Sequence, residues 1–408
     1  MSRLEKTLLG INILLYGFLT IFSFAYVDLN LTLTQNPQIL SFVKLMQQLG
    51  YYNRPQATLI YLIFIALAFL FFVLHLWLFY KSKIGLKYLK FSTILNVIIL
   101  VFAYPFLSSD LFNYLFDAKI IWKYHASPYA FKPLDFEQDE WLRFMRWTHR
   151  YSPYGPLWLG MSLVPAVLGF GKFILNFLTF KIFIGIFHLI NSYLIFKTIN
   201  KINPRLAIFS TAFYALNPLL LIEGVANSHN DVVLATFILV PFYFLSINRI
   251  FLSYLGLIGG TLIKYIPILN LPWLLLWSYY PKFRNSKKME NDKNSITKLV
   301  LLNLATMTIF TYLFSSFRIT VPFVSSGATQ VQFQPWYLFW TIPFVAIAPR
   351  LGLVAISIAI SAGASLRYLP FLYYGDWSQP YTTTFMQIVL IIPAIFVILG
   401  IAFFSIKK

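Results

Sequence analysis

The sequence predicts an all-α protein that crosses a membrane many times, and three observations support this. Of its 408 residues, 59% are hydrophobic and 11% are charged, whereas a soluble domain has roughly 45–50% apolar and about 25% charged residues. Apolar runs such as 61–80 and 386–405 reach the roughly 20 residues that a helix needs to span a bilayer. The net charge of +19 lies in short clusters between these runs, which is typical of the loops that orient membrane proteins and argues against nucleic acid as the partner.

Basic clusters alternate with the apolar runs and set their expected direction. If the N-terminus is cytoplasmic, 19 of the 32 lysine and arginine residues fall on that side, with only 3 of the 13 acidic residues. The chain is then expected to hold its basic loops inside and its acidic residues outside, with both termini cytoplasmic. The expected spans lie near residues 7–27, 58–80, 91–107, 173–196, 206–225, 232–248, 299–317, 335–348, 351–371 and 384–405.

Two apolar stretches do not fit a simple alternation. Residues 157–170 contain Pro165 and Gly169, and a full crossing there would force the next basic cluster outside, so we expect an embedded helix that does not cross. Residues 251–280 join two basic clusters and must cross twice or not at all. Their Gly-Gly and Lys-Tyr-Ile-Pro breaks predict two short half-helices, a feature that bilayers tolerate where the backbone is buried in protein or lines an aqueous cavity. The total is about 12 crossings.

The chain is expected to form a single domain over residues 1–408, with no internal repeat. The first apolar run ends near Val27 and is longer than the 7–15 apolar residues of a signal peptide, so we favour an uncleaved span, although Ser23-Phe24-Ala25 would suit cleavage. A large outer loop occupies residues 108–150. A basic loop at 281–298 is expected in the cytoplasm as a solvated segment. The absence of cysteine excludes disulfides and thiolate metal sites.

The outer loop opens with a carboxylate directly after a span. Asp110 follows Ser108 and Ser109, and a charge at a membrane boundary is costly unless it has a partner or a function. The alternative is that Asp110 only caps the next helix, since serine and aspartate are good caps. Asp117 lies two helical turns further on and is expected to pair with Lys119 or Lys123.

Four further segments place polar and aromatic residues at the expected outer ends of the spans, as Asp110 is. Tyr154 lies in a rigid Pro-Tyr-Gly-Pro turn, although tyrosine, proline and tryptophan there also suit an interfacial aromatic belt. Lys264 lies at a predicted helix break, where the alternative is a lysine whose amine extends to the membrane surface. The candidate binding residues are Asp117, Tyr154, His229, Asn230, Asp231, Lys264, Tyr265, Arg318, Gln334, Trp336 and Tyr337.

This inventory suits the transfer of a sugar from an anionic lipid carrier. Asp110 can act as a base toward a hydroxyl group, with Asp231 as a second carboxylate. Cations such as Lys264, Arg318 and Arg150 can hold a phosphate and compensate the charge that grows on it as it leaves. The apolar spans can receive a polyprenyl tail. No Walker, GxGxxG, HExxH or Gly-x-Ser-x-Gly motif is present, so nucleotide binding and familiar hydrolysis have no support.

The ordered set of these segments resembles the GT-C superfamily of membrane glycosyltransferases. Within it the chain is most similar to bacterial polyprenol-phosphate-mannose-dependent α-mannosyltransferases. The matching pieces are SSDLFNYLFDAKIIWKYHASPY (108–129), YSPYGPLWL (151–159), NPLLLIEGVANSHND (217–231), KYIP (264–267) and QPWYLFW (334–340). The resemblance implies that Asp110 is the catalytic base, that residues 229–231 line the same cavity, and that basic residues contact the donor phosphate.

The expected activity is therefore that of a hexosyltransferase. It would move a hexose, most simply mannose, from a polyprenyl-phosphate donor to a glycan or lipid-linked acceptor, with inversion, on the outer face of the plasma membrane. No cofactor is expected. A divalent metal has no support, because the doubled Asp-x-Asp of some relatives is missing. The alternatives are a secondary transporter or flippase for lipid-linked glycans, and a non-catalytic partner in glycan assembly.

Overall fold

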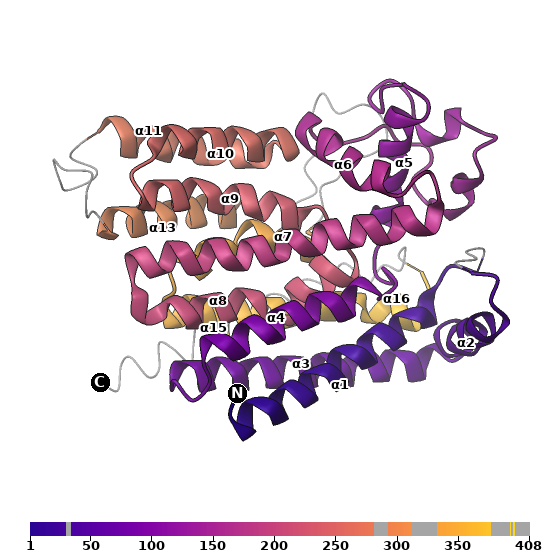
Figure 1. Cartoon of the computed structure of the whole chain (residues 1–408), viewed down its shortest axis with the longest axis horizontal. Helices are drawn as coiled ribbons and strands as arrows, with labels where there is room; N and C mark the ends of the chain where they lie inside the picture. The colour runs from indigo at the N-terminus through magenta and orange to yellow at the C-terminus, as the bar shows by residue number, and fades with distance from the viewer. Residues whose placement is uncertain (30–33, 281–292, 312–332, 377–391, 393–394, 396–408) are drawn as a thin grey trace.

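The computed structural model describes residues 1–29, 34–280, 293–311 and 333–376, together with 392 and 395. Over these residues every regular element is a helix and no strand is present, which confirms the predicted all-α class. Most helices lie side by side along the long axis of the molecule (Figure 1), while α5, α6 and the loop between them gather at one end. The expected span at 384–405 and the basic segment 281–292 lie outside the described residues.

The structure gives the following bounds for its helices. The α-helices are α1 (Arg3–Ser23), α2 (Pro37–Gln47), α3 (Arg54–Tyr80), α4 (Leu86–Val101), α5 (Asp110–Trp122), α6 (Pro156–Leu168), α7 (Phe173–Ile202), α8 (Ala207–Ala215), α9 (Asp231–Ser246), α10 (Ile250–Ile263), α11 (Leu271–Tyr279), α13 (Lys293–Ile309), α14 (Ile342–Ile347), α15 (Leu351–Ser365) and α16 (Leu369–Tyr374). Tighter or wider helical turns join several of them, including η6 (Leu220–Ala226), η7 (Ile266–Asn270), η9 (Pro335–Trp340) and η10 (Leu366–Tyr368).

Four helical segments of the described chain are long and apolar enough to cross a membrane. They are Arg3–Tyr26, Arg54–Tyr80, Phe173–Ile202 and Leu351–Tyr374, and a bent pair of helices would make a fifth. Shorter apolar helices, including α6, α9 and α10, are also present. The chain is therefore a multi-pass membrane protein, and the total of about 12 crossings stays a prediction.

The expected span at 206–225 contains a bend, and its crossing of the membrane stays a prediction. The segments Pro204–Ala215 and Leu220–Ala226 differ in direction by 60°. Pro218 lies at the bend and has no N–H for a helical hydrogen bond, and it disfavours the helical conformation of the residue before it. The side chain of Asn217 compensates locally, since its Oδ1 accepts a hydrogen bond from Leu219 N at 3.0 Å. The bend directs the following residues toward the end of the bundle that carries α5.

The segment 251–280 forms a helical hairpin. The Tyr254 hydroxyl of α10 donates to Leu274 O at 3.4 Å and approaches Ser278 Oγ at 2.9 Å. Because Tyr254 precedes the turn while its partners follow it, the second helix returns alongside the first. This is the path that two short crossings require, and it leaves Lys264 at the turn of the hairpin.

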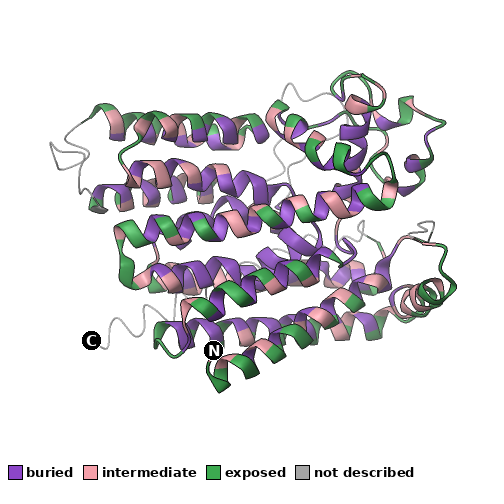
Figure 2. Ribbon diagram, viewed as in Figure 1, coloured by how far each residue is buried: buried purple, intermediate pink, exposed green. Residues whose placement is uncertain are grey.

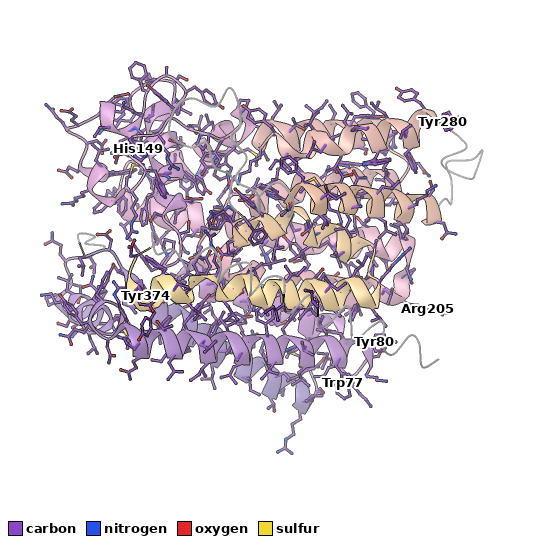
Figure 3. The ribbon with its side chains drawn as sticks, turned by 180° about the vertical axis from the view of Figure 1, so that it is seen from behind. Trp77, Tyr80, His149, Arg205, Tyr280 and Tyr374 are labelled. Atoms are coloured by element: carbon purple, nitrogen blue, oxygen red, sulfur yellow. The ribbon has the colours of Figure 1, made fainter. Side chains whose placement is uncertain are left out.

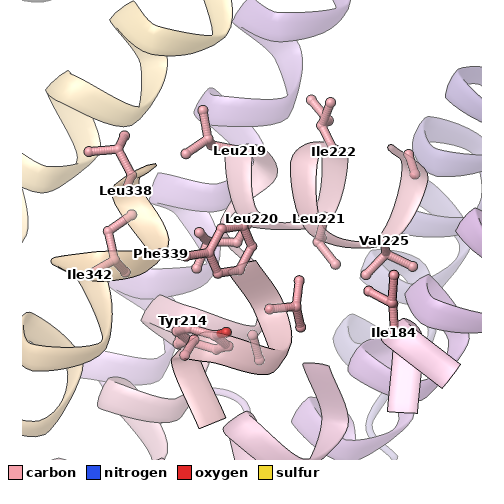
Figure 4. Packing of buried hydrophobic residues seen from close by; sticks show 14 of the residues in the cluster. Ile184, Tyr214, Leu219, Leu220, Leu221, Ile222, Val225, Leu338, Phe339 and Ile342 are labelled. Atoms are coloured by element: carbon pink, nitrogen blue, oxygen red, sulfur yellow. The ribbon is translucent and has the colours of Figure 1, made fainter. Parts of the chain in front are cut away.

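The core lies around the bend and its neighbours. Figure 2 shows buried residues concentrated on the central helices and exposed residues on the outward faces of the outer ones. Leu220, Leu221 and Phe339 are fully buried, and the close view in Figure 4 shows η6 packed against η9. A Cβ at Gly224 would lie 2.7 Å from the Phe339 ring, so only glycine allows this approach. The core thus fixes η6, the element that leads into the polar segment described below.

The two basic loops that the structure describes, after α3 and after α7, lie at one end of the molecule. Tyr80 and Arg205 mark this end, while His149 and Tyr374 lie at the other (Figure 3). The N-terminus belongs to the basic end, because Glu5 Oε1 accepts a hydrogen bond from Gly85 N at 3.1 Å. The structure therefore separates the basic loops from the loop 108–150 along the axis of the bundle.

This separation makes a topology test direct. The chain has no cysteine, so single cysteines placed at Ser127, in the loop 108–150, and at Ser82, in the basic loop after α3, report on one site each. We expect an impermeant maleimide to label S127C in intact cells and S82C only after lysis. The reverse pattern would place the basic end outside and overturn the predicted orientation.

Candidate active site

The segment that joins η6 to α9 is polar and entirely buried. Asn227, Ser228, His229, Asn230 and Asp231 are each 0% exposed. The backbone turns back on η6, since Asn227 N donates to Ile222 O at 2.8 Å and His229 N donates to Glu223 O at 3.1 Å. Ser228 has a positive φ of 60°, a conformation that costs a non-glycine residue on the order of 1–3 kcal/mol and tends to occur at functional sites.

His229 lies between two carboxylates from different elements. Its Nδ1 is 3.4 Å from Asp110 Oδ2, at the first residue of α5, and its Nε2 is 3.3 Å from Glu223 Oε2 in η6. Burial alone would lower the pKa of the imidazole, but the two carboxylates outweigh it and raise the pKa of His229 to about 9.

Asp110 is not the cap of α5. Ser109 occupies the cap position, and it makes no side-chain capping bond. The Asp110 carboxylate instead contacts His229, and 21% of its side chain is exposed, whereas the side chains of Glu223 and Asp231 are 1% and 0% exposed. Of these three carboxylates, Asp110 is the one that a substrate can reach.

Asp231 binds two donors with its two oxygens. Its Oδ2 is 2.6 Å from Lys264 Nζ, and its Oδ1 accepts a hydrogen bond from Trp340 Nε1 at 2.7 Å. Lys264 therefore points toward the buried segment and pairs with Asp231, and its binding role stays a prediction. Asp231 also opens α9, where a negative charge is favoured by the partial positive charge of the helix N-terminus.

The Pro-Tyr-Gly-Pro turn holds Lys264 in place. Gly155 N donates to Ile263 O at 2.9 Å, and a Cβ at Gly155 would lie 2.1 Å from Leu262 O. Only glycine permits this contact between the turn and the end of α10. The neighbouring Tyr154 ring centroid lies 5.8 Å from Lys264 Nζ, so the turn supplies both the support and an aromatic wall.

Aromatic rings complete the site from two sides. Trp336 stacks on His229 with ring centroids 3.9 Å apart, and Tyr337 stacks on Trp340 at 4.1 Å. On the α5 side, the Tyr114 hydroxyl is 3.3 Å from both Asn230 N and Asn230 Oδ1. The structure thus brings Asp110, Tyr154, residues 229–231, Lys264 and residues 336–337 to one place.

Some predicted residues lie elsewhere or outside the described chain. The expectation that Asp117 pairs with Lys119 or Lys123 is wrong, because both amines face Asp139 instead, with Lys119 Nζ at 2.7 Å and Lys123 Nζ at 3.9 Å from Asp139 Oδ2. Burial raises the pKa of Asp117 to about 7. The side chain of Arg150 stacks on Trp147 at 4.3 Å, in the outer loop. The role of Asp117 stays a prediction.

Two other predicted binding residues differ in their surroundings. Tyr265 is 62% exposed, beside the network and not within it. Gln334 forms a hydrogen bond through its side-chain oxygen with Arg367, a cation that the sequence analysis did not select. Arg318 lies outside the described residues. The binding roles of these residues also stay predictions.

Sequence reasoning missed two buried charged residues beside the site. Glu223 lies inside an expected span, and Lys181 lies in the middle of α7, where it is 0% exposed. Lys181 Nζ donates to Ala226 O at 2.6 Å and Val225 O at 3.2 Å, and it lies 3.4 Å from Ser228 Oγ. An ionisable residue within a span is itself a signal of function, and this signal could have identified both.

The arrangement offers a base, cations and aromatic walls, and no evident metal site. Within the described ranges, no group of three or more histidine, aspartate or glutamate side chains could hold a metal ion. Polar residues from α5, η6, α9, α10 and η9 meet where several short helices end. Such a site can remove a proton from a hydroxyl group and hold an anion beside it.

Comparison with known proteins gives one match. A family model described as the N-terminal domain of alpha-(1→6)-mannopyranosyltransferase matches residues 15–280, about two-thirds of the chain. This range contains Asp110, His229, Asp231 and Lys264. Neither the curated proteins nor the solved structures contain a match.

Proposed function

The chain belongs to the alpha-(1→6)-mannopyranosyltransferase family, and from this premise we propose that it transfers mannose from a polyprenyl-phosphate donor to a hydroxyl group of a glycan or lipid-linked acceptor. Transfer takes place on the outer face of the membrane and inverts the anomeric configuration. The observation that carries this proposal is the accessible carboxylate of Asp110, beside a buried network that holds a second cation, Lys264.

Asp110 acts as the general base. Its Oδ2 faces His229, and the exposed part of its side chain is available to the acceptor. As the acceptor oxygen attacks the anomeric carbon of mannose, its proton passes to Asp110. The new carbon–oxygen bond forms as the bond between the anomeric carbon and the phosphate oxygen breaks, and the electron pair leaves with polyprenyl phosphate. Attack from the face opposite the phosphate gives inversion.

Positive charge near the leaving group assists this step. Lys264 keeps 17% of its side chain exposed while Asp231 fixes its amine. Arg367 adds a second cation through its bond to Gln334. Preorganised charges of this kind stabilise the negative charge that develops on a leaving phosphate, and they act most strongly where water is excluded. We assign Lys264 and Arg367 to the phosphate side of the site.

A lipid-linked donor fits the surroundings of Lys264. Leu255, Ile258 and Leu262 are 47%, 53% and 39% exposed, and their spacing places them on one face of α10. This stripe leads along the helix to Lys264 at its end. A polyprenyl tail that follows the stripe within the bilayer brings its phosphate to the amine.

The proposal is tested with the purified protein in nanodiscs. The probes are polyprenyl-phosphate mannose as donor and octyl mannoside as acceptor, with the 6-deoxy form of octyl mannoside as the matched control. We expect release of polyprenyl phosphate and a dimannoside whose new bond is at the 6-hydroxyl, with the anomeric configuration opposite to that of the donor. The 6-deoxy acceptor should give no dimannoside.

Other outcomes would identify the error. A donor that stays intact under all conditions, but moves between the leaflets of a vesicle that contains the protein, would favour a flippase. Transfer that proceeds equally well with the 6-deoxy acceptor would refute transfer to the 6-hydroxyl group. A product that retains the donor configuration would refute direct displacement by the acceptor.

A further inference from the structure

Glu223 is a buried carboxylate that the proposed reaction leaves without a role. It lies in η6 among Leu220, Leu221 and Ile222, and only 1% of its side chain is exposed. Its Oε2 is 3.2 Å from Asn227 Nδ2 and 3.3 Å from His229 Nε2. A carboxylate removed from water is strongly disfavoured unless it is paired and hydrogen-bonded, so the contact with the imidazole needs an explanation.

The geometry around His229 selects the charged ring. A neutral imidazole has one N–H donor and one acceptor nitrogen, whereas the imidazolium donates from both nitrogens. Here both nitrogens face carboxylate oxygens, Nδ1 toward Asp110 and Nε2 toward Glu223. A neutral ring would set a lone pair against one of the two carboxylates, which is repulsive. The second proton on the ring removes this conflict.

We propose that Glu223 is a positioning residue, which holds His229 as an imidazolium with its Nδ1–H directed at Asp110 and thereby orients the catalytic carboxylate. Glu223 acts only through His229, because the imidazole ring lies between it and Asp110. Trp336 restricts the same ring by stacking on it. The Asp110 carboxylate is thus held by one oxygen, which leaves the other for the acceptor proton.

The proposal has a pH consequence whose sign follows from the surroundings. Burial lowers the pKa of His229, and the nearby carboxylates of Asp110 and Glu223 raise it to about 9. Without the charge of Glu223, only the Asp110 carboxylate opposes the effect of burial on the imidazole. The pKa of His229 therefore falls, and the ring loses its second proton at a lower pH. The other titratable or charged groups around this pair are Tyr61, Tyr114, Tyr154, Lys181, Asp231, Lys264, Tyr337, Arg367 and Tyr368.

The test variant is Glu223→Gln, which keeps the size and an oxygen for Asn227 but removes the charge. An opposite charge at this distance moves a pKa by about 1–3 units. We expect the alkaline limb of the kcat profile, near pH 9 in the native protein, to move down by about 1–3 units in the variant. Glu223→Asp retains the charge and is the matched control, with an alkaline limb that stays above that of the glutamine variant.

The pH profile of kcat can be measured only if the proposed function is correct. A second measurement therefore follows the protonation of His229 without using activity. NMR of the protein labelled with ¹⁵N at histidine reports the protonation of each imidazole ring. The chain has five histidines, and the signals that are missing from a His229→Gln sample are those of His229. We expect the His229 signal to titrate near pH 9 in the native protein and about 1–3 units lower in Glu223→Gln. This result holds whether or not mannosyl transfer is detected.

The outcomes separate the two proposals. If the native protein transfers no mannose but His229 titrates as expected, the proposed function fails and the charged imidazole stands. If the protein is active but Glu223→Gln lowers the rate equally at every pH, with an unshifted His229 signal, then Glu223 is merely structural and the inference is refuted. If Glu223→Gln does not fold, Glu223→Asp becomes the test. This shorter carboxylate keeps the charge, so the His229 signal of Glu223→Asp must titrate near pH 9, as in the native protein, and a lower value would refute the inference.

Discussion

Asp110→Asn should lose nearly all mannosyl transfer while the protein still inserts into the membrane and binds donor. The amide keeps the size of the carboxylate and can still contact His229, but it cannot accept a proton from the acceptor hydroxyl. General base catalysis typically contributes about 10²–10⁴-fold, so kcat should fall by that factor. The measurement is release of polyprenyl phosphate at saturating donor and acceptor, with donor binding followed separately.

Matched aspartate variants decide whether the correct carboxylate has been chosen. Asp117→Asn alters the same helix and should keep most of the activity, because Asp117 is 4% exposed and, of these two aspartates, Asp110 is the one that contacts His229. Asn also caps a helix about as well as Asp, so a capping role predicts an active Asp110→Asn protein and a less stable Asp110→Ala protein. Native turnover in Asp110→Asn, with a dead Asp117→Asn or Asp231→Asn, would reject Asp110 as the base.

Much of the fold and part of the site could be predicted because their signals are local. Apolar length predicted the helices, and the basic clusters predicted which loops share one end of the molecule. Asp110, His229 and Asp231 were selected because polar residues at the ends of apolar runs are costly without a function. The Lys-Tyr-Ile-Pro break predicted a turn that leaves Lys264 at a helix end. Each inference used residues within about one helical turn of each other.

The pairings within the site could not be predicted in the same way. Asp110 and His229, or Asp231 and Trp340, are joined only by tertiary packing, which no local pattern encodes. Lys119 was expected to pair with its sequence neighbour Asp117, but the fold brings Asp139 closer. Glu223 lies near the end of the expected span at 206–225, and only the bend near Pro218 and the tertiary packing bring it to His229. The missing information was therefore the direction of the chain after each short helix.

Lys264→Gln should impair both stability and donor use, for two separable reasons. The first is the loss of an ion pair in which the Asp231 side chain is 0% exposed. Removing one partner of a buried pair costs about 3–5 kcal/mol, because the other charge is left uncompensated. We expect a clear fall in the thermal unfolding temperature of the variant, and a partial recovery in Lys264→Arg, which restores the charge.

The second reason is the proposed contact with the donor phosphate. A hydrogen bond to a charged group contributes about 1.5–3 kcal/mol, so its loss should raise the apparent KM for donor by about 10- to 100-fold. The double variant Lys264→Gln/Asp231→Asn separates the two effects. It removes both charges of the pair and keeps an oxygen for Trp340 Nε1, so most of the stability should return.

The KM for donor decides which role Lys264 has. If Lys264 binds the phosphate, the double variant regains stability but keeps the high KM for donor, because neither glutamine nor asparagine supplies a positive charge. If Lys264 serves only to neutralise Asp231, the same double variant regains both stability and a native KM. Recovery of both would remove Lys264 from the phosphate side of the site and leave Arg367 as the cation assigned to it.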